Sequence, residues 1–222
     1  PYGRHARPGW GPTIPSRLGW LIMESPAVIL FAAVYALGDR AWQAAPLALA
    51  GLWMAHYVHR TLVFPFRMRE RGKRMPVVIA AMAFAFNVLN AYVISRWISH
   101  LGEYPTSWLW DPRFLVGAAV FAVGSGINHR ADTTLIGLRR PGETGYRIPE
   151  GWLFDRITSP NYFGEILEWI GFAIATWSLA GLAFAVFTAA NIGPRAFANR
   201  RWYRATFPDY PADRKALIPF LW

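Results

Sequence analysis

Residues 159–193 of the chain read SPNYFGEILEWIGFAIATWSLAGLAFAVFTAANIG. The charged side chains of this stretch, Glu165 and Glu168, lie near its beginning, and the remainder is apolar as far as Gly193. Such a continuous apolar run is typical of membrane helices, because the strands of a membrane barrel alternate between apolar and polar residues. Ionisable groups at the edge of a membrane segment are costly and usually functional. The stretch therefore predicts membrane helices with a polar site at their mouth.

The composition of the whole chain favours the same class. Of its 222 residues, 54% are hydrophobic and 12 are Trp, which is more than a soluble domain of this size usually carries. The chain has no Cys, which excludes disulfides and thiolate metal sites. The formal net charge of +10 could indicate nucleic acid, but the Arg residues lie in short connections between apolar runs. Membrane orientation explains them better, and no nucleic-acid partner is expected.

Six apolar segments can be recognised, and they predict an all-α integral membrane protein with a bundle of about six transmembrane helices. The segments are residues 18–37, 44–64, 76–95, 113–135, 162–178 and 181–194. The last two are short and are joined through residues 177–181, so they form either a hairpin or one kinked helix. The sequence has no internal repeat and no long linker, and residues 1–222 are interpreted as a single domain.

The distribution of basic residues tests this count of spans. With six spans, one side of the membrane carries the basic N-terminal segment, the connections at residues 65–75 and 136–161, and the tail from Arg195. The other side has little positive charge beyond three residues: Arg40, Arg96 and Arg113. Since positive charge accumulates on the cytoplasmic side, the basic side is predicted to be cytoplasmic. A single long helix over 162–194 would move the tail across the membrane, so the hairpin is favoured.

Glu24 lies inside the first apolar segment, in GWLIMESPAVILF, two residues before Pro26. Proline lacks a backbone N–H and tends to kink a helix at this point. A carboxylate within the membrane is expensive, whereas a neutral carboxylic acid can donate a hydrogen bond, as a general acid must. Glu24 is therefore a candidate acid, and the alternative is a carboxylate paired with a neighbouring Arg.

The second segment ends in HYVHRT, residues 56–61. Tyr57 can donate a proton to a carbonyl oxygen if its hydroxyl faces a cleft, and the alternative is an aromatic residue at the headgroup level. His56 and His59 are a weak candidate for a metal site, because they lack the i, i+4 spacing of helical metal ligands. No metal is expected.

Polar residues gather in the second half of the chain. Asn161, Glu165 and Glu168 are spaced i, i+4, i+7, which puts them on one face of a helix, like the wall of a ligand cleft. Asn128 and Asp132 are spaced i, i+4 at the end of the fourth segment. This spacing places them on one face of that helix as well.

Basic and aromatic residues accompany these polar groups. They are Arg139, Tyr146 and Arg147 after the fourth segment, and Arg195, Asn199, Arg201 and Tyr203 in the tail. Such a set suits a ligand with ribose hydroxyls and phosphates. Two alternatives stay open, which are positive-inside anchoring with a helix cap and binding of lipid headgroups. The chain has no G-x-G-x-x-G after a strand and no P-loop, so a nucleotide site would not be Rossmann-like.

Seven stretches of the sequence together resemble the steroid 5α-reductase family, membrane reductases of 3-oxo-Δ4-steroids. The match extends from about Tyr2 to the C-terminus, and LRRPGETGYRIP followed closely by SPNYFGEILEWIG is very specific. The other stretches that carry it are WLIMESP, HYVHRT, GINHRAD, ATWSLAG and RKALIPFLW. A looser form of the PNYxGE–W element also occurs in sterol C14 reductases and isoprenylcysteine methyltransferases.

The resemblance implies NADPH-dependent reduction of an enone C=C bond by a protein with seven spans, so one span is expected upstream of Pro1. Glu24 and Tyr57 match the family's catalytic carboxylate and tyrosine, which hydrogen-bond the 3-oxo group of the substrate. Donors at this oxygen stabilise the enolate-like transition state as hydride reaches the β-carbon. The family often has Gln immediately before this carboxylate. This chain has Met23 there, so one polar partner is missing.

The resemblance also implies that residues 18–95 serve the substrate and residues 113–222 the cofactor. The implied cofactor residues are Asn128, Asp132, Arg139, Tyr146, Arg147, Asn161, Glu165, Arg195, Asn199, Arg201 and Tyr203. Some relatives have His at the position of Asn199. Glu168 either contacts the cofactor or braces its helix. The walls of an apolar steroid pocket are expected at three aromatic residues: Tyr2, Trp20 and Phe86.

Other functions are compatible with parts of the sequence. A reductase of another lipid enone, such as a sterol or a polyprenol-like compound, would use the same groups. A SAM-dependent lipid methyltransferase would not need an acid pair at a carbonyl oxygen, and a lipid-binding scaffold would leave the polar face unexplained. We expect a steroid reductase in the bacterial inner membrane or an equivalent membrane, surrounded by lipid, with its NADPH site facing the cytoplasm. No oligomeric state is predicted.

Overall fold

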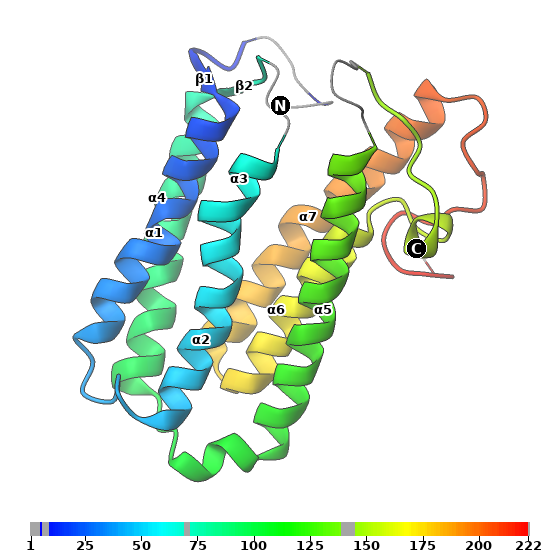
Figure 1. Ribbon diagram of the computed structural model, residues 1–222. Helices are drawn as coiled ribbons and strands as arrows, with labels where there is room; N and C mark the ends of the chain where they lie inside the picture. Colours follow the sequence, from blue (N-terminus) through cyan, green and yellow to red (C-terminus); the bar gives the residue numbers. More distant parts are fainter. Residues whose placement is uncertain (1–4, 6–8, 69–71, 139–144, 222) are drawn as a thin grey trace. The chain divides into compact units, whose positions relative to one another are not determined.

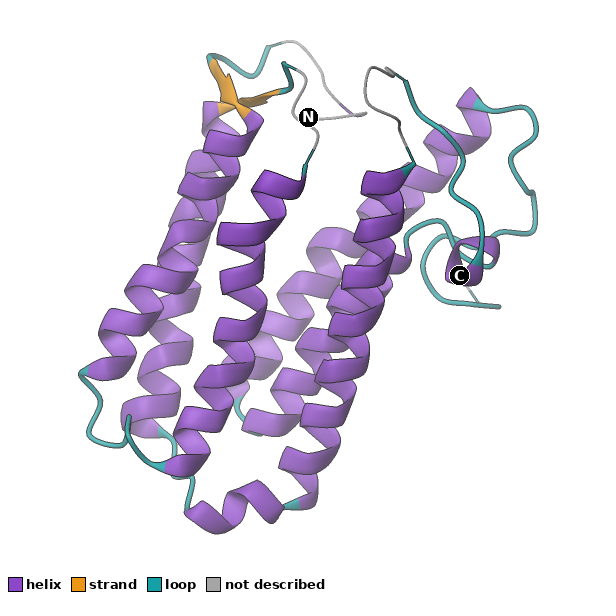
Figure 2. Ribbon diagram, in the orientation of Figure 1, coloured by secondary structure: helices purple, strands orange, loops and turns teal. Residues whose placement is uncertain are grey.

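The structure of the protein is a computed structural model. It describes His5 and residues 9–68, 72–138 and 145–221. The chain divides into two compact units, residues 1–111 and 112–222, which are described in turn. Figure 2 shows that nearly all of the described regular structure is helical, with two short strands in unit 1. The prediction of an all-α fold is confirmed.

Unit 1 consists of long helices with short elements at their ends (Figure 1). In chain order these are β1 (Thr13–Pro15), α1 (Ser16–Ala36), α2 (Ala44–Val58), the π-helix η2 (His59–Val63), α3 (Phe64–Arg67), β2 (Arg74–Pro76), α4 (Val77–Arg96), the π-helix η3 (Trp97–Leu101) and the 3-10 helix η4 (Thr106–Trp110). β1 pairs with β2 antiparallel, with Ile14 opposite Met75. Since α1 and α4 follow these strands directly, they begin at the same end of the unit and run in the same direction (Figure 1).

Helix α1 continues through Pro26. The proline has no N–H to donate to Ile22 O, and the hydroxyl of Ser25 donates to that oxygen at 2.9 Å. The following turn is held from α2, because the indole Nε1 of Trp53 donates to Ala27 O at 2.8 Å. Hydrogen bonds from side chains therefore support α1 around the proline, and one of them fixes α2 to it.

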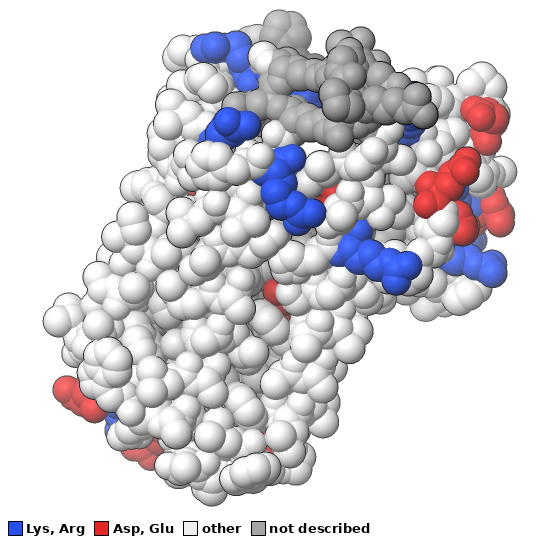
Figure 3. All heavy atoms as spheres, in the orientation of Figure 1, with Lys and Arg blue, Asp and Glu red and all other residues white. Residues whose placement is uncertain are grey.

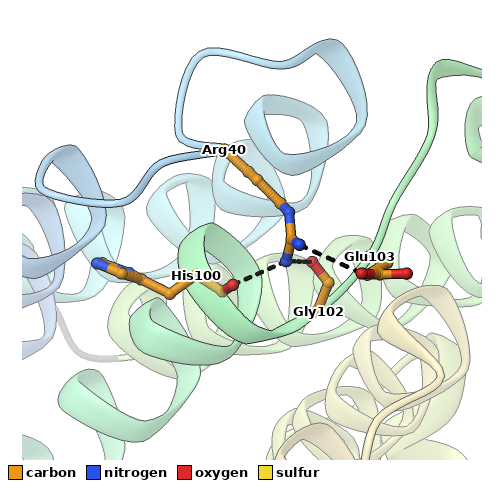
Figure 4. Close-up of polar contacts among 4 residues, drawn as sticks. All are labelled: Arg40, His100, Gly102 and Glu103. Atoms are coloured by element: carbon orange, nitrogen blue, oxygen red, sulfur yellow. Dashed lines mark hydrogen bonds and ion pairs between the residues drawn. The ribbon is translucent and has the colours of Figure 1, made fainter.

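Arg40 ties the connection between α1 and α2 to the end of the α4–η3 helix (Figure 4). One guanidinium nitrogen donates to His100 O at 2.7 Å and to Gly102 O at 3.0 Å, and the other lies 3.3 Å from Glu103 Oε1. The backbone N–H of Arg40 donates to Ser99 O at 3.0 Å. The last carbonyl groups of a helix have no N–H donors within the helix itself. Arg40 supplies donors to such groups here.

The described residues of unit 2 form three long helices and one short 3-10 helix (Figure 1). They are α5 (Pro112–Gly137), the 3-10 helix η5 (Trp152–Asp155), α6 (Pro160–Thr176) and α7 (Leu179–Thr206). α6 ends where Trp177 takes a left-handed conformation at φ 44°, and the Ser178 hydroxyl then caps α7 by accepting from Gly181 N at 3.0 Å. α6 and α7 pack against each other, so the predicted hairpin is confirmed and the single kinked helix is wrong.

Helices α5 and α6 approach each other through glycines spaced seven residues apart. Gly117 and Gly124 on α5 face Gly171 and Gly164 on α6. A Cβ atom on Gly124 would lie 2.6 Å from Gly164 O, and one on Gly171 would lie 2.7 Å from Gly117 O. Any side chain at these positions would meet the backbone of the facing helix, so glycine is required.

Several helices extend beyond the segments predicted from hydropathy. The last helix continues from the predicted end at residue 194 to Thr206, because residues 195–206 favour a helix although they are too basic for an apolar segment. The third segment is prolonged by η3 to Leu101. The second, predicted at 44–64, is helical to Arg67 but changes to a π-helical turn at His59. Hydropathy located each long helix but not the full extent of its polar ends.

Three described helices are long and apolar enough to cross a membrane, namely Ser16–Ala36, Val77–Leu101 and Leu179–Thr206. The remaining predicted segments correspond to α2, α5 and α6, which are shorter or more polar. In unit 1, Lys and Arg gather near the end at which β1 and β2 lie, and the visible surface along the helices is nearly free of charge (Figure 3). Large apolar side chains such as Ile29 and Leu89 are exposed on these helices. The protein is therefore a helical membrane protein.

Candidate active site

The carboxyl group of Glu24 is held by a neighbouring helix. Glu24 lies on α1 and is half-buried. The side-chain amide of Asn87 on α4 donates to Glu24 Oε2 at 3.1 Å and to Met23 O at 2.7 Å. The hydroxyl of Thr61 in η2 donates to Glu24 O at 3.3 Å. Two segments that are distant in sequence therefore fix the position of this acid.

Tyr57 lies on α2 with its side chain buried in a row of aromatic rings. Phe31 stacks on Trp53 with ring centroids 5.0 Å apart, and Trp53 lies 4.5 Å from the ring of Tyr57. Since Trp53 also donates to the backbone of α1, this row holds α2 against the helix that carries Glu24. The two residues predicted to be catalytic thus lie on adjacent helices of one unit.

Two of the aromatic residues predicted to line an apolar pocket also lie in unit 1. Trp20 is half-buried on α1, one turn before Glu24. Phe86 is half-buried on α4, directly before Asn87. Both aromatic residues are therefore close in sequence to the contact between Glu24 and Asn87. The third predicted residue, Tyr2, lies outside the described residues.

The described part of the chain contains no group of three or more His, Asp or Glu side chains arranged to hold a metal ion. His56 lies against the ring of Tyr57, with centroids 5.0 Å apart, and His59 begins the π-helical turn η2. His56 therefore lies on the helix that carries Tyr57, and His59 lies in the turn that follows it.

In unit 2, the structure brings together three residues predicted to bind a cofactor. Asn128 and Asp132 are buried one turn apart on α5, and Asn161 lies in the first turn of α6. The amide of Asn128 donates to Asn161 O at 3.0 Å, and the amide of Asn161 donates to Asp132 Oδ1 at 3.2 Å. The glycine contact allows this arrangement, because Gly164 lies directly against the backbone of Asn128.

Glu165 and Glu168 follow Asn161 on α6, and their surroundings differ. Glu165 is half-buried, whereas Glu168 is 0% exposed and its backbone lies against Gly124 of α5. The sequence left open whether Glu168 contacts the cofactor or braces its helix. Complete burial at the α5–α6 contact favours the bracing role.

The basic part of α7 connects to the beginning of α6. The amide of Asn199 donates to the hydroxyl of Ser159, the N-cap residue of α6, at 3.3 Å. Arg195 is half-buried one turn before Asn199, and Arg201 is exposed. The predicted tail residues therefore lie on a helix that is joined to the polar residues of α6.

Tyr146 and Tyr203, both predicted to bind the cofactor, belong to one aromatic cluster. The ring of Tyr146 lies 4.8 Å from Trp202, and Trp202 lies 5.1 Å from the buried Tyr203. Arg147 is exposed beside Tyr146. Arg139 lies outside the described residues.

The C-terminal segment after α7 has a role that the sequence did not indicate. Arg214 is buried and donates to Pro149 O at 2.9 Å. The hydroxyls of Thr158 and Tyr210 share a hydrogen bond of 2.7 Å, and Thr158 N donates to Lys215 O at 2.8 Å. Burial raises the pKa of the Tyr210 phenol, although the nearby Thr158 and Arg214 oppose this shift. This segment fixes the residues immediately before α6. Its last residues, RKALIPFLW, contributed to the family resemblance, but no structural role was predicted for them.

Asn87 was also missed in the sequence analysis. The available signal was an Asn within the apolar stretch AMAFAFNVLN, residues 81–90, where a polar side chain is expensive. The sequence predicted that Met23 deprives Glu24 of a polar partner. The structure supplies a partner from α4, and the backbone oxygen of Met23 accepts from the same amide.

The chemistry of the unit 2 residues fits a nicotinamide dinucleotide. Carboxylates such as Asp132 and Glu165 accept hydrogen bonds from ribose hydroxyls or a carboxamide, and Asn161 can donate and accept. Arg195 and Arg201 supply fixed positive charge for phosphates. The residues that could hold the cofactor are therefore present in the described part of unit 2.

The fold and these groups define a helical membrane protein with an acid and a tyrosine in one unit and a polar, basic site in the other. Residues 73–222 match the family described as 3-oxo-5-alpha-steroid 4-dehydrogenase. The whole chain is 45% identical to the steroid 5-alpha-reductase DET2 of Gossypium hirsutum and covers 88% of it. Over 99% of its length, it is 44% identical to 3-oxo-5-alpha-steroid 4-dehydrogenase 1 of Homo sapiens, of which it covers 85%.

The chain therefore belongs to the steroid 5-alpha-reductase family. It is an oxidoreductase that acts on a CH–CH group, and its family implies a nicotinamide cofactor. The resemblance predicted from the sequence is confirmed.

Proposed function

We propose that the protein uses NADPH to reduce the C4=C5 double bond of 3-oxo-Δ4-steroids to give 5α-dihydrosteroids. The observation that carries the proposal is the carboxyl of Glu24, fixed within an apolar helix adjacent to the helix of Tyr57. Two possible proton donors in an apolar unit suit a lipophilic substrate with one carbonyl oxygen. The 45% sequence identity to a steroid 5-alpha-reductase over the whole chain supports the same substrate class.

In the proposed mechanism, Glu24 and Tyr57 bind the 3-oxo oxygen of the steroid. When bound, NADPH supplies the hydride that adds to C5. Negative charge then develops on the 3-oxo oxygen, and hydrogen bonds from the carboxylic acid and the phenol stabilise this charge more strongly than they stabilise the neutral ketone. A proton from solvent then adds at C4, so the double bond gains one hydride from the cofactor and one proton from water, while Glu24 and Tyr57 keep their protons.

The residues of unit 2 would hold the cofactor. Asp132 and Asn161, which are already fixed to each other, would bind hydroxyl or carboxamide groups, together with Asn128 and Glu165. Phosphates would be bound by arginines, with Arg139, Arg147, Arg195 and Arg201 as the candidates from the sequence. Tyr146, Asn199 and Tyr203 complete the proposed set. We place this site on the basic, cytoplasmic side of the bacterial inner membrane or an equivalent membrane.

The test is an assay of the purified protein in lipid nanodiscs with NADPH and a 3-oxo-Δ4-steroid. The protein should oxidise NADPH and form a 5α-dihydro product, identified by chromatography against 5α and 5β standards. The matched control is the 3-hydroxy-Δ4 analogue, which has the same ring system without the enone and should not be reduced. If only other lipid enones are reduced, the substrate class is wrong. Methyl transfer from SAM without reduction would contradict the whole proposal.

A further inference from the structure

We infer that Asn87 is a positioning residue for the catalytic acid, which it orients so that the acid proton lies on Glu24 Oε1 and is offered to the substrate. The inference rests on the proposed function of Glu24 and adds a residue to which neither the sequence analysis nor the family resemblance gave a role. The amide of Asn87 bridges two successive residues of α1, Met23 and Glu24.

The hydrogen bonds determine which atom of the Asn87 side chain faces α1. Met23 O is a backbone carbonyl and can only accept, so the atom 2.7 Å from it must be the amide nitrogen. The same nitrogen lies 3.1 Å from Glu24 Oε2. One hydrogen of this nitrogen therefore points to Met23 O and the other to Glu24 Oε2, so Glu24 Oε2 accepts a hydrogen bond in this contact.

This contact decides where a proton can lie on the carboxyl group. If Glu24 Oε2 carried the acid proton, it would be a poor acceptor for the N–H group of Asn87, and the acid proton and the amide hydrogen would face each other. When Glu24 is protonated, the proton therefore lies on Oε1 and Oε2 keeps its bond to Asn87. The amide thus orients the acid, and the proton is directed away from α4.

The position of Asn87 argues for a functional role over a packing role. Its side chain is only 6% exposed, and apart from Asn90 the other buried residues of α4 are small or apolar, such as Ala80, Ala91 and Ile94. An apolar residue would fill this space without the cost of burying an amide in a membrane helix. A polar side chain at this position is understandable if the carboxyl it binds must be held for catalysis.

Asn90, one turn further along α4, provides the matched comparison. It is also buried, but among the described residues no acceptor lies within hydrogen-bonding distance of its Nδ2. Asn90→Ala and Asn87→Ala therefore remove the same atoms from the same helix, and Asn87→Ala alone also removes a bond to Glu24.

The experiment compares Asn87→Ala, Asn87→Asp and Asn90→Ala with the wild-type protein in nanodiscs. We expect both Asn87 variants to lower kcat about 10- to 100-fold with little change in the KM for steroid, because a displaced acid weakens binding of the transition state. Asn87→Asp keeps the shape and replaces the donor by an acceptor, so a role in filling space predicts wild-type kcat for it. Unchanged NADPH affinity shows that each variant is folded.

A second readout does not depend on turnover. Infrared spectra of the wild type and Glu24→Gln identify the carboxyl band of Glu24 by difference. In Asn87→Ala this band should move to higher wavenumber, because Oε2 loses its donor, and in Asn90→Ala it should stay in place. An unmoved band in Asn87→Ala, or an equal loss of kcat in Asn87→Ala and Asn90→Ala, would overturn the inference. A wild-type protein without steroid reductase activity would contradict the proposed function, while the infrared comparison would still test the contact.

Discussion

The two units use opposite means of placing polar groups in a membrane protein. In unit 1, the rings of Phe31, Trp53 and Tyr57 pack between α1 and α2, and single donors such as Trp53 and Asn87 reach across to α1. In unit 2, glycines bring the backbones of α5 and α6 together, and the amides of Asn128 and Asn161 beside them donate hydrogen bonds across the contact. The first arrangement holds one acid in apolar surroundings. The second assembles many donors and acceptors at one place, as binding of a large polar cofactor would require.

The largest effect is expected where unit 2 depends on close backbone contact. Gly124→Leu should lower the free energy of unfolding by about 3 kcal/mol or more and abolish NADPH binding, because its side chain would meet the backbone of α6. Thermal unfolding in detergent, followed by tryptophan fluorescence, measures this loss. Gly126→Ala is the control, since a Cβ there meets nothing within 4 Å and should leave stability unchanged or slightly higher. Equal losses in both variants would show that the glycine contact is not what holds the helices.

The next effect concerns the chemistry assigned to unit 1. Glu24→Gln and Tyr57→Phe should each lower kcat about 10²- to 10³-fold, because each removes a donor to the developing oxyanion. NADPH affinity, measured by fluorescence titration, should stay unchanged. Tyr35→Phe is the control, since the Tyr35 hydroxyl donates to Ala41 O within the same aromatic row and has no proposed part in the reaction. Wild-type turnover in both catalytic variants would remove Glu24 and Tyr57 from the mechanism.

A smaller effect is expected for binding in unit 2. Asp132→Ala should weaken NADPH binding about 10- to 100-fold, because the amide of Asn161 loses its acceptor and the cofactor loses a carboxylate. The measurement is the dissociation constant for NADPH, with kcat at saturating NADPH as the companion value. Asp155→Ala is the control, because this exposed carboxylate accepts a local hydrogen bond from Gly151 N, four residues earlier. If the two variants bind NADPH equally well, Asp132 does not belong to the cofactor site.

The smallest effect is expected at the far end of unit 1. Arg40→Ala should lower the free energy of unfolding by about 1–2 kcal/mol, because two backbone carbonyls lose a charged donor (Figure 4). Glu103→Ala should change it by less than about 0.5 kcal/mol, since the Glu103 side chain is 83% exposed. Thermal unfolding of both variants measures the difference. A larger loss in Glu103→Ala would mean that the ion pair, and not the carbonyl contacts, stabilises this connection.

Much of the fold followed from hydropathy, since each of the six apolar segments is a helix and the hairpin at residues 177–181 is present. Helix ends were less predictable. Residues 195–206 continue α7 because helix formation depends on backbone bonds and propensity, while hydropathy records only the apolar part. In the candidate site, the i, i+4 spacing placed Asn128 and Asp132 on one face, and both prove to be buried beside Asn161. Asn87 and Arg214 were missed because their partners lie far away in the chain.

The sequence by itself determined the class of the protein, its helices, the family and the residue types available for chemistry. These follow from local composition, periodicity and short motifs, all of which are readable along one segment. Tertiary structure decided which residues are partners, including the contact of Asn87 with Glu24, the approach of α5 to α6 at Gly124, and the burial of Glu168. Such pairings depend on how helices dock. Many residues on a helix face could meet a neighbour, and only packing selects the ones that do.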